Sequence, residues 1–411
     1  MERIILHSDL NNFYASVECL LHPELRDKYV AVCGNKEERH GIVLAKNMAA
    51  KNMGVKTGEA IWEAKAKCPE LIIVPPTFSE YAKFSKIVNS IYRRYTNQVE
   101  PFGMDECWLD VTGSTSLFGS GREIAEQIRK TVKEETGLTV SVGVSFNKIF
   151  AKLGSDLKKP DAVSEITRDN FRQTAWQLPA ECLMGVGRAT SKKLTRQCIR
   201  TIGDIANTPP EYLERMLGKC GLILHRHANG IDNSPVLDTN YSYPIKSIGH
   251  GITATCDLEG YREVKNVLLY LSADVSHRLR RNRLRAGGIA IAVRYPGLST
   301  REFQCQLEYP TVSMQAMTYA AMELFRDNHP HNCMVRALTI RAINLVPDDV
   351  AIQTSMFFDT HRIEKELKAE DAMEELNNRF GENTVTYASI LGDIKVPSKE
   401  KKEIILPRGK L

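Results

Sequence analysis

Apolar positions in the first 165 residues alternate between the periods of strands and of helices. The run RIILHSD at 3–9 is apolar up to its final acid and predicts a buried strand. Phe13, Val17 and Leu20 follow at helical spacing. The same alternation continues beyond them, so we expect one region of mixed strands and helices. The pattern predicts strands at 29–34, 41–45, 98–102, 107–113 and 139–147, and helices at 46–54, 77–96, 121–136 and 148–159.

Two further patterns follow along the chain. Residues 166–235 read as helices interrupted by Gly and Pro. From residue 241 the predicted order is strand, helix, strand, strand, helix, strand, which is the split-βαβ arrangement. Its elements are predicted at 245–255, 261–284, 289–295, 302–308, 313–327 and 337–346, and one more helix is predicted near 361–380.

Composition narrows the class of protein. A chain of 411 residues that is 43% hydrophobic can bury more than one core, which indicates two to four domains and excludes wholesale disorder. The chain has no apolar run long enough to span a membrane, and its N-terminus lacks the features of a signal peptide. Its ten cysteines are scattered without a C-x-x-C pair, so we expect reduced thiols in a cytoplasmic protein.

The charge is unevenly distributed. Residues 241–346 carry 13 basic and 8 acidic side chains, and the remaining residues carry 42 of each, so this segment holds the whole net charge of +5. Within it, 277–301 contains seven arginines and no carboxylate. Taken alone, such a run is either a solvated face or a surface for a polyanion.

Three acids are candidates for metal chemistry. Asp9 ends the first predicted strand, and Asp105 and Glu106 lie between two later strands. Strand ends can bring such carboxylates together at one sheet edge, where they and the carbonyl of Leu10 would suit a pair of divalent ions. Such a pair supports in-line displacement at phosphorus. By spacing alone, ordinary strand-end and turn acids are the commoner explanation.

Three segments carry a family resemblance. SDLNNFYASVE at 8–18, GMDECWLD at 103–110 and FNKIFAKLGSDLKKPD at 146–161 together resemble the Y-family translesion DNA polymerases of the polymerase IV branch. Their order and separations match those of the family, and the resemblance covers residues 1–345.

The resemblance implies an α+β multidomain fold, the right-hand polymerase. It would have a ferredoxin-like palm, small fingers, a thumb with a helix-hairpin-helix, and a split-βαβ little-finger domain. The expected bounds are 1–10 and 77–165 for the palm, 11–76 for the fingers, 166–235 for the thumb, 241–346 for the little finger and 347–411 for a tail.

The implied activity is template-directed addition of deoxynucleotides to a primer 3′-hydroxyl. The resemblance implies two Mg²⁺ ions, with Mn²⁺ able to substitute, and low-fidelity translesion synthesis without a proofreading nuclease. The expected partners are primer–template DNA, deoxynucleoside triphosphates and a sliding clamp, and we expect a monomer. Two rivals are a palm-type nucleotide cyclase and a catalytically inactive DNA- and clamp-binding protein. A cyclase has no need of a duplex-binding domain.

The resemblance also assigns roles to residues around the acids. Asp9 and Asp105 would bridge both metal ions with the Leu10 carbonyl, and Glu106 would bind the ion that activates the primer hydroxyl. Tyr14 would be the steric gate against a ribose 2′-hydroxyl. Two further expectations complete the set: Phe13 lies beneath the incoming sugar or in the core, and Lys159 reaches the triphosphate. Without the resemblance, Tyr14 reads as a half-buried helix aromatic and Lys159 as a solvated lysine.

The sequence departs from the family pattern in the fingers. The pattern has a threonine, a tyrosine and an arginine that contact the triphosphate, and here these positions are Ala45, Met48 and Lys51. Lys51 keeps a charge but loses the bidentate guanidinium. Lys46 or Asn47 could compensate, and the sequence leaves that choice open.

Two segments resemble the DNA-contacting parts of the family. LMGVGRATSKKL at 183–194 fits a helix-hairpin-helix, in which Gly185 and Gly187 expose backbone amides to a phosphate and Lys192 adds charge, although the same glycines also occur in plain turns. The arginine run resembles the duplex grip of the little finger. Its candidate contacts are Arg278, Arg280, Arg281, Arg283 and Arg285.

A short apolar peptide follows the last predicted strand of the split-βαβ region. QTSMFF at 353–358 resembles a clamp-binding peptide, with Gln353, Met356 and Phe357 as its anchors. Peptides of this composition also arise by chance. The assignment therefore depends on the position of the peptide directly after the split-βαβ region.

Overall fold

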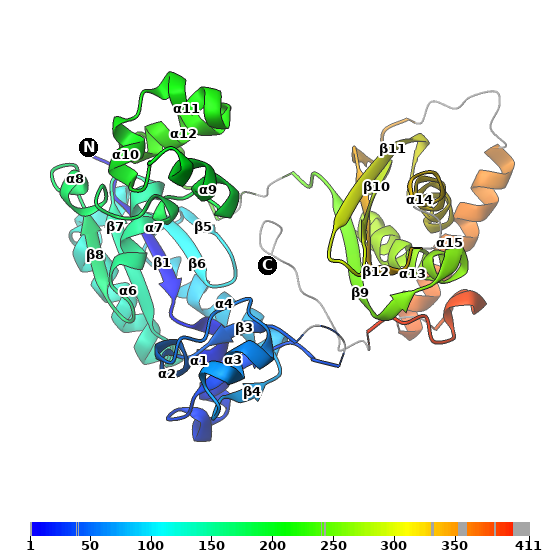
Figure 1. Ribbon diagram of the computed structural model, residues 1–411, viewed down its shortest axis with the longest axis horizontal. Coiled ribbons are helices and arrows are strands. Elements are labelled where there is room, and N and C mark those ends of the chain that lie inside the picture. The colour runs from blue at the N-terminus through cyan, green and yellow to red at the C-terminus, as the bar shows by residue number, and fades with distance from the viewer. Residues whose placement is uncertain are drawn as a thin grey trace. The chain divides into compact units, whose positions relative to one another are not determined.

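The computed structural model describes residues 2–37, 39, 41–239, 241, 244–329, 333–351, 360–381 and 384–397. The described chain forms two units (Figure 1). The first unit contains Met1–Gly34 and Ile42–Tyr243, and the second contains Asn35–Gly41 and Pro244–Lys401. No helix within the described ranges is long and apolar enough to cross a membrane. The proposed clamp peptide, with Gln353, Met356 and Phe357, lies outside the described residues.

A five-stranded sheet forms the centre of the first unit. Its order is β5-β6-β1-β7-β8, and every neighbouring pair is antiparallel except β7 and β8. The central strand β1 is buried along its whole length, as its apolar run predicted. The strands are β1 (Ile5–Leu10), β5 (Val99–Pro101), β6 (Glu106–Asp110), β7 (Val140–Ser145) and β8 (Val163–Ile166).

Helices cover both faces of this sheet. The helices α4 (Phe78–Tyr92) and α6 (Gly121–Thr136) share one apolar core with it, and α7 (Lys148–Leu157) packs on β1 and β7. The bounds of α6 are those that the sequence predicted. A reciprocal capping box between Ser120 and Glu123 begins the helix, and Gly137, with φ of 73°, ends it.

A smaller three-stranded sheet, ordered β3-β2-β4, lies in the segment expected to be the fingers. The sequence pattern predicted two of its strands, β2 (Val30–Cys33) and β3 (Val43–Lys46), and missed β4 (Ile72–Val74). Strand β4 is only three residues long, too short to display a period. The helices of this segment are α1 (Phe13–Leu21), α2 (Met48–Asn52) and α3 (Ile61–Lys67).

The segment 166–235 is helical, as predicted, and its helices share an apolar core with α7. A capping side chain and a glycine with positive φ set two of the helix limits. Thr201 caps α10 through its side chain, and Gly218, with φ of 64°, separates α11 from α12. The helices are α8 (Phe171–Thr174), α9 (Arg188–Arg196), α10 (Ile202–Asn207), α11 (Pro210–Leu217) and α12 (Lys219–Ala228).

The second unit confirms the predicted split-βαβ order. Its four strands form an antiparallel sheet, ordered β11-β10-β12-β9, and α13 and α14 cover one face of that sheet (Figure 1). The strands run longer than their apolar centres suggested. The elements are β9 (Ile248–Leu258), α13 (Gly260–Arg281), β10 (Leu284–Arg294), β11 (Thr300–Thr311), α14 (Met314–Asn328) and β12 (Val335–Ile343), and the short β13 (Val346–Pro347) pairs with β10.

The predicted tail helix, α15 (Thr360–Phe380), is part of this unit. Glu370 on α15 is only 5% exposed, and its carboxylate accepts hydrogen bonds from the backbone amides of Met314 (3.0 Å) and Gln315 (3.2 Å). It also accepts one from the Ser313 hydroxyl at 2.8 Å. A carboxylate at this place satisfies amides that the first turn of α14 leaves unpaired and complements the helix dipole. The sequence predicted the helix but not this contact.

Candidate active site

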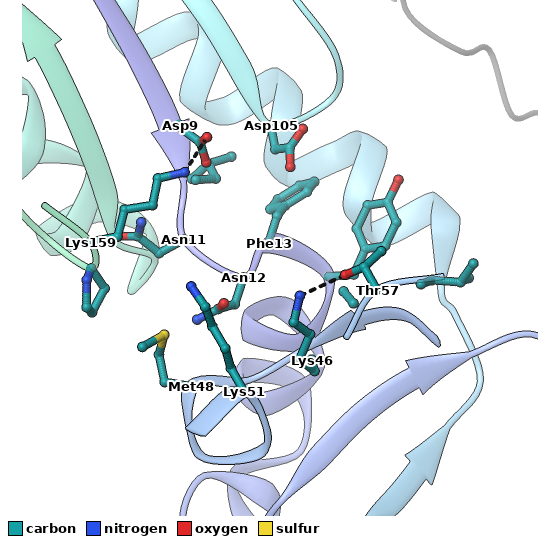
Figure 2. A pocket seen from close by; sticks show the side chains of 15 residues that line it. Asp9, Asn11, Asn12, Phe13, Lys46, Met48, Lys51, Thr57, Asp105 and Lys159 are labelled. Atoms are coloured by element: carbon teal, nitrogen blue, oxygen red, sulfur yellow. Dashed lines mark hydrogen bonds and ion pairs between the residues drawn. The ribbon is translucent and has the colours of Figure 1, made fainter. Parts of the chain in front are cut away.

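An open cavity of about 450 Å³ lies in the first unit where β1, α1, β3 and α2 meet (Figure 2). Its lining includes the acids Asp9 and Asp105, the ring of Tyr14, and the lysines Lys51 and Lys159. Residues far apart in the sequence therefore meet around one space, as the motifs suggested. Glu106 is not among the residues that line it.

Strand register explains how the acids come together. Antiparallel pairing of β1 with β6 sets Asp9 directly opposite Glu106. The backbone amide of Leu10 donates to the carbonyl of Asp105 at 2.9 Å, which fixes the turn before β6 against the end of β1. Directly opposed residues project to the same face of a sheet, so the register alone concentrates negative charge here.

The two acids of the cavity differ in how their charge is balanced. The Lys159 ammonium lies 2.7 Å from an oxygen of Asp9 and 2.7 Å from one of Asp156. Burial raises the pKa of Asp9, although Lys159 opposes the shift. Burial and then the charges of Asp9 and Glu106 raise the pKa of Asp105 to about 6. Of the two acids, Asp105 is thus the less compensated.

Glu106 is directed away from the cavity and towards α7. Its carboxylate accepts from the Lys152 ammonium at 2.5 Å and lies 3.5 Å from Nε2 of His7. Burial alone would raise the pKa of Glu106, but His7 and Lys152 outweigh it and hold the pKa at about 2. His7 is itself fully buried, with Nδ1 2.8 Å from the hydroxyl of Ser155. The sequence analysis missed both partners of Glu106.

The donors suit a hard divalent cation. Asp9 and Asp105 bring two carboxylates, each with a raised pKa, to one cavity, where a cation would relieve their repulsion. Over the ranges that the structure describes, however, no three or more His, Cys, Asp or Glu side chains are grouped closely enough to hold a metal ion. Glu106 must exchange Lys152 for the metal before it could complete the set.

Tyr14 presents an ordered ring to the cavity. It stacks on Tyr81 with ring centroids 4.3 Å apart and an interplanar angle of 10°, and it forms a T-shaped pair with Phe78 whose centroids are 6.0 Å apart. Its hydroxyl lies 3.6 Å from the sulfur of Met104. Phe13 is buried in the core, as one of its two alternatives expected, and it also lines the cavity, so a place beneath the incoming sugar stays a prediction.

Asn11 is a positioning residue that the sequence analysis did not single out. Its amide oxygen accepts from the backbone amide of Asp161 at 2.8 Å, and its amide nitrogen donates to Ser141 at 2.9 Å. The Asp161 carboxylate in turn lies 2.7 Å from both Arg129 and Lys133. These contacts hold the loop that carries Lys159. The sequence offered one sign of this role: an asparagine two positions after Asp9, the acid at the end of the first strand.

In the fingers, the structure distinguishes Lys46 from Asn47, the two candidates to replace the missing triphosphate contacts. Ala45, Met48 and Lys51 line the cavity, and so does Lys46, whose ammonium donates to the Thr57 hydroxyl at 2.8 Å. Asn47 does not line it. The side chain of Asn47 instead caps α2 by accepting from the amide of Ala50 at 3.0 Å, and it also donates to the Lys28 carbonyl.

The helix-hairpin-helix candidates lie at the start of α9. Gly185 has φ of 98°, a conformation that favours glycine, and Gly187 is the N-cap of the helix. Lys192 is exposed on α9. The first backbone amides of this helix are therefore preceded by glycines, and an exposed lysine lies on the same helix, an arrangement compatible with a phosphate contact.

The candidate arginines Arg278 and Arg280 form ion pairs within the unit: Arg278 is 45% exposed and lies 3.5 Å from Asp274, and Arg280 is more buried. Its side chain is 17% exposed and lies 3.1 Å from Asp371 and 3.5 Å from Glu370, both on α15. Its charge is committed within the unit, so the expectation that it contacts DNA is not supported by its placement. The sequence could not reveal this contact, because the partners lie about 90 residues away. Arg278, Arg281 and Arg283 are exposed, and Arg285 is partly exposed.

The sheet face that α13 and α14 leave uncovered carries two arginines outside that set. Alternation along β10 places Ala290, Ala292 and Arg294 on this face, opposite the apolar side chains that pack under the helices. Strand register sets Arg341 of β12 beside Ala290. Ala290 is only 1% exposed, however, and Arg341 forms an ion pair with Glu302 of β11, so the charge of this arginine is already balanced within the sheet. In the sequence, the alternation of side chains along this strand was the sign that Arg294 lies on the uncovered face.

Three family models match the chain. The model described as the impB/mucB/samB family covers residues 8–156, and the one described as its C-terminal domain covers 245–356. A model described as the thumb domain of DNA polymerase-iota covers 181–232. The matched regions account for most of both units.

Curated relatives and a solved structure agree with these models. A DNA polymerase IV of Acetivibrio thermocellus is 50% identical over 393 residues, spanning 96% of this chain and 98% of the relative. One from Bacillus velezensis is 36% identical over 95% of this chain and 93% of its own length. A Y-family DNA polymerase chimera matches the fold with a TM-score of 0.75 at 24% identity, covering 84% of this chain and 99% of the chimera, which confirms the right-hand fold class. The chain therefore belongs to the Y-family of DNA polymerases, in its DNA polymerase IV branch.

Proposed function

We propose that this DNA-directed DNA polymerase, which carries out translesion synthesis, joins a deoxynucleotide to a primer 3′-hydroxyl in the cavity bounded by Asp9, Asp105 and Lys159. One observation carries the proposal: a single cavity has two carboxylates on one wall, of which Asp105 is poorly compensated, and lysines on other walls. In a bound triphosphate, the metal ions would complement the carboxylates and the phosphates would complement the lysines. The comparisons give no support to an inactive paralogue.

Membership of the family implies dependence on divalent metal, and we propose two Mg²⁺ ions, with Mn²⁺ able to substitute. When bound, the ions supply the charge that activates the 3′-hydroxyl and stabilises the leaving pyrophosphate. Asp9, Asp105 and the Leu10 carbonyl would hold them. Glu106 would join after its carboxylate leaves Lys152, a lysine that is then free to neutralise other negative charge nearby.

Lys159 is proposed to change partners during the cycle. Its ammonium lies between Asp9 and Asp156 while the carboxylates lack any other counter-charge. Once Asp9 binds metal, attraction to that carboxylate falls, and the lysine can turn to a triphosphate oxygen. Asn11 supports this role, because it fixes the loop and leaves the long side chain to move.

Tyr14 is proposed to exclude ribonucleotides. A hydroxyl on the 2′ carbon would overlap a ring that its stack on Tyr81 prevents from moving aside. Phe13 would support the sugar from below. Discrimination then comes from shape, and it requires an ordered ring rather than a hydrogen bond.

For DNA, we propose phosphate contacts from both units. Gly185, Gly187 and Lys192 would hold one backbone phosphate at the start of α9. Exposed arginines of the second unit would lie along duplex phosphates, and Arg280 is omitted because α15 neutralises it. The proposed contacts are Arg278, Arg281, Arg283 and Arg285.

The peptide at 353–358 is proposed to bind a sliding clamp. Its support is its sequence and its place after the second unit's last strand. Gln353 would donate and accept at the rim of an apolar pocket filled by Met356 and Phe357.

Asp105→Asn is expected to reduce single-nucleotide incorporation by about a thousandfold or more, because it removes an anionic metal ligand and preserves shape. Asp110→Asn is the matched control, since Asp110 lies at the other end of β6 and bonds to Thr112. Extension by Asp105→Asn at the wild-type rate would refute the metal assignment. Failure of the wild-type protein to extend a primed template with Mg²⁺ and four dNTPs would refute the function itself.

Tyr14→Ala is expected to raise the incorporation of ribonucleotides relative to deoxynucleotides by roughly tenfold or more, because the overlap with the 2′-hydroxyl disappears. The ratio of kcat/KM values for rNTP and dNTP measures it. Tyr14→Phe keeps the ring and should keep the discrimination. An unchanged ratio in the alanine variant would show that another residue is the gate.

The double variant Arg281→Ala/Arg283→Ala is expected to weaken duplex binding and to lower the slope of log Kd against log salt by about 2, since each phosphate contact contributes about 0.9. Fluorescence anisotropy over a salt series measures both quantities. Arg326→Ala, an exposed arginine of α14 paired with Glu323, is the control and should change neither. Equal slopes for all three proteins would exclude these arginines from the interface.

Met356→Ala/Phe357→Ala is expected to weaken clamp binding at least about tenfold, because the apolar anchors are lost. The affinity is measured by binding of the protein to surface-immobilised clamp. Extension without the clamp should be unchanged, and Ser355→Ala serves as a control within the same peptide. Wild-type affinity of the double variant would locate the clamp contact elsewhere.

A further inference from the structure

A pair of lysines occupies the fingers wall of the cavity. Lys46 is the last residue of β3, and Lys51 lies on α2. Both line the cavity that contains Asp9 and Asp105, and Figure 2 shows their side chains rising from these two elements into the same space. The wall therefore presents two positive charges to whatever occupies the cavity.

The protein does not neutralise this pair. Lys46 donates to a neutral group, the hydroxyl of Thr57, and neither lysine forms an ion pair with any residue that the structure describes. The nearby carboxylate of Glu59 is bonded to Lys67 and to the backbone amide of Lys56. Burial, and after it the charge of Lys51, lowers the pKa of Lys46. Holding two cations together here costs free energy that a bound anion would recover.

Thr57 makes the arrangement more specific than two neighbouring lysines. Its oxygen accepts the hydrogen bond from Lys46, so its own hydroxyl hydrogen stays available to donate. Thr57 also lines the cavity. Fixing the flexible side chain of Lys46 in advance lowers the entropy that binding must otherwise overcome. The result is a preorganised set of two ammonium groups and one hydroxyl donor.

We propose that Lys46, oriented by Thr57, binds the β- and γ-phosphates of the incoming deoxynucleoside triphosphate together with Lys51. The inference rests on the proposed function, which puts the nucleotide in this cavity. The polyphosphate is the part of the nucleotide with several negative charges, so it gains most from two adjacent cations. The neutral base and sugar would gain little from them.

Lys159 alone does not provide this charge. Its ammonium lies 2.7 Å from oxygens of both Asp9 and Asp156, and when a metal ion takes over Asp9 its charge is still shared with Asp156. Ala45 and Met48 line the same wall and offer no hydrogen-bond donor from their side chains. Lys46 and Thr57 therefore supply donors that these two neighbours lack.

Single-nucleotide incorporation by the full-length protein on a matched primer–template tests the inference. Lys46→Ala is expected to raise the KM for dNTP roughly tenfold and to change kcat less than about threefold, because a charged phosphate contact is lost. Lys46→Arg should stay near wild type, and Thr57→Val should show a smaller rise in KM. Lys65→Ala, an exposed lysine of α3 that does not line the cavity, controls for net charge and should change nothing.

Inorganic tripolyphosphate gives a readout that does not depend on catalysis. Calorimetry with Mg²⁺ present should find binding to the wild-type protein that Lys46→Ala weakens by about the same factor as its KM rises. Three results for Lys46→Ala would each overturn the inference. The KM for dNTP could stay within twofold of wild type, or the substitution could change the Kd for primer–template instead. The third result is an effect that depends on the templating base while tripolyphosphate binding is unchanged. If the wild-type protein bound tripolyphosphate but extended no primer, the proposed function would fail while the anion site stood.

Discussion

Repulsion among the carboxylates at the ends of β1 and β6 is the constraint on which the arrangement of the first unit depends. The strand register forces Asp9 and Glu106 together, so the fold must supply positive charge from elsewhere. The helix α7 carries Lys152, which neutralises Glu106, and the loop after α7 carries Lys159, which neutralises Asp9. One helix and its following loop thus supply the counter-charges of Asp9 and Glu106. Under the proposed function, Lys46 and Lys51 on the fingers wall would balance the negative charge of a bound triphosphate.

The sequence predicted the fold well where periodicity extended over several residues. The bounds of α6 and the split-βαβ order of the second unit followed from apolar spacing, capping residues and turn residues. It failed for α3 and β4, which are too short to show a period and are stabilised by packing within the small sheet. Propensity over so few residues is a weak guide beside tertiary contacts.

The candidate site was predictable to the extent that its residues belong to contiguous motifs. Asp9, Asp105, Tyr14 and Lys159 do line one cavity, although their roles stay predictions. The attachment of Glu106 to Lys152 and of Arg280 to α15 could not be read from the sequence, because each joins side chains about 45 to 90 residues apart. The choice between Lys46 and Asn47 was equally inaccessible, since it depends on which side chain caps a helix.

The docking of α15 has a consequence for genetics. Glu370 supplies the cap that the first turn of α14 needs, and Met373, Tyr387, Ile390 and Val396 pack against the core of the same unit. A premature stop codon shortly after β13 would therefore do more than shorten a tail. It would remove the carboxylate that accepts from the amides of Met314 and Gln315 and would uncover the apolar surface on which α15 and the segment after it pack. A null phenotype from such an allele would report the unfolding of a whole unit, and only point substitutions can isolate what the tail contacts.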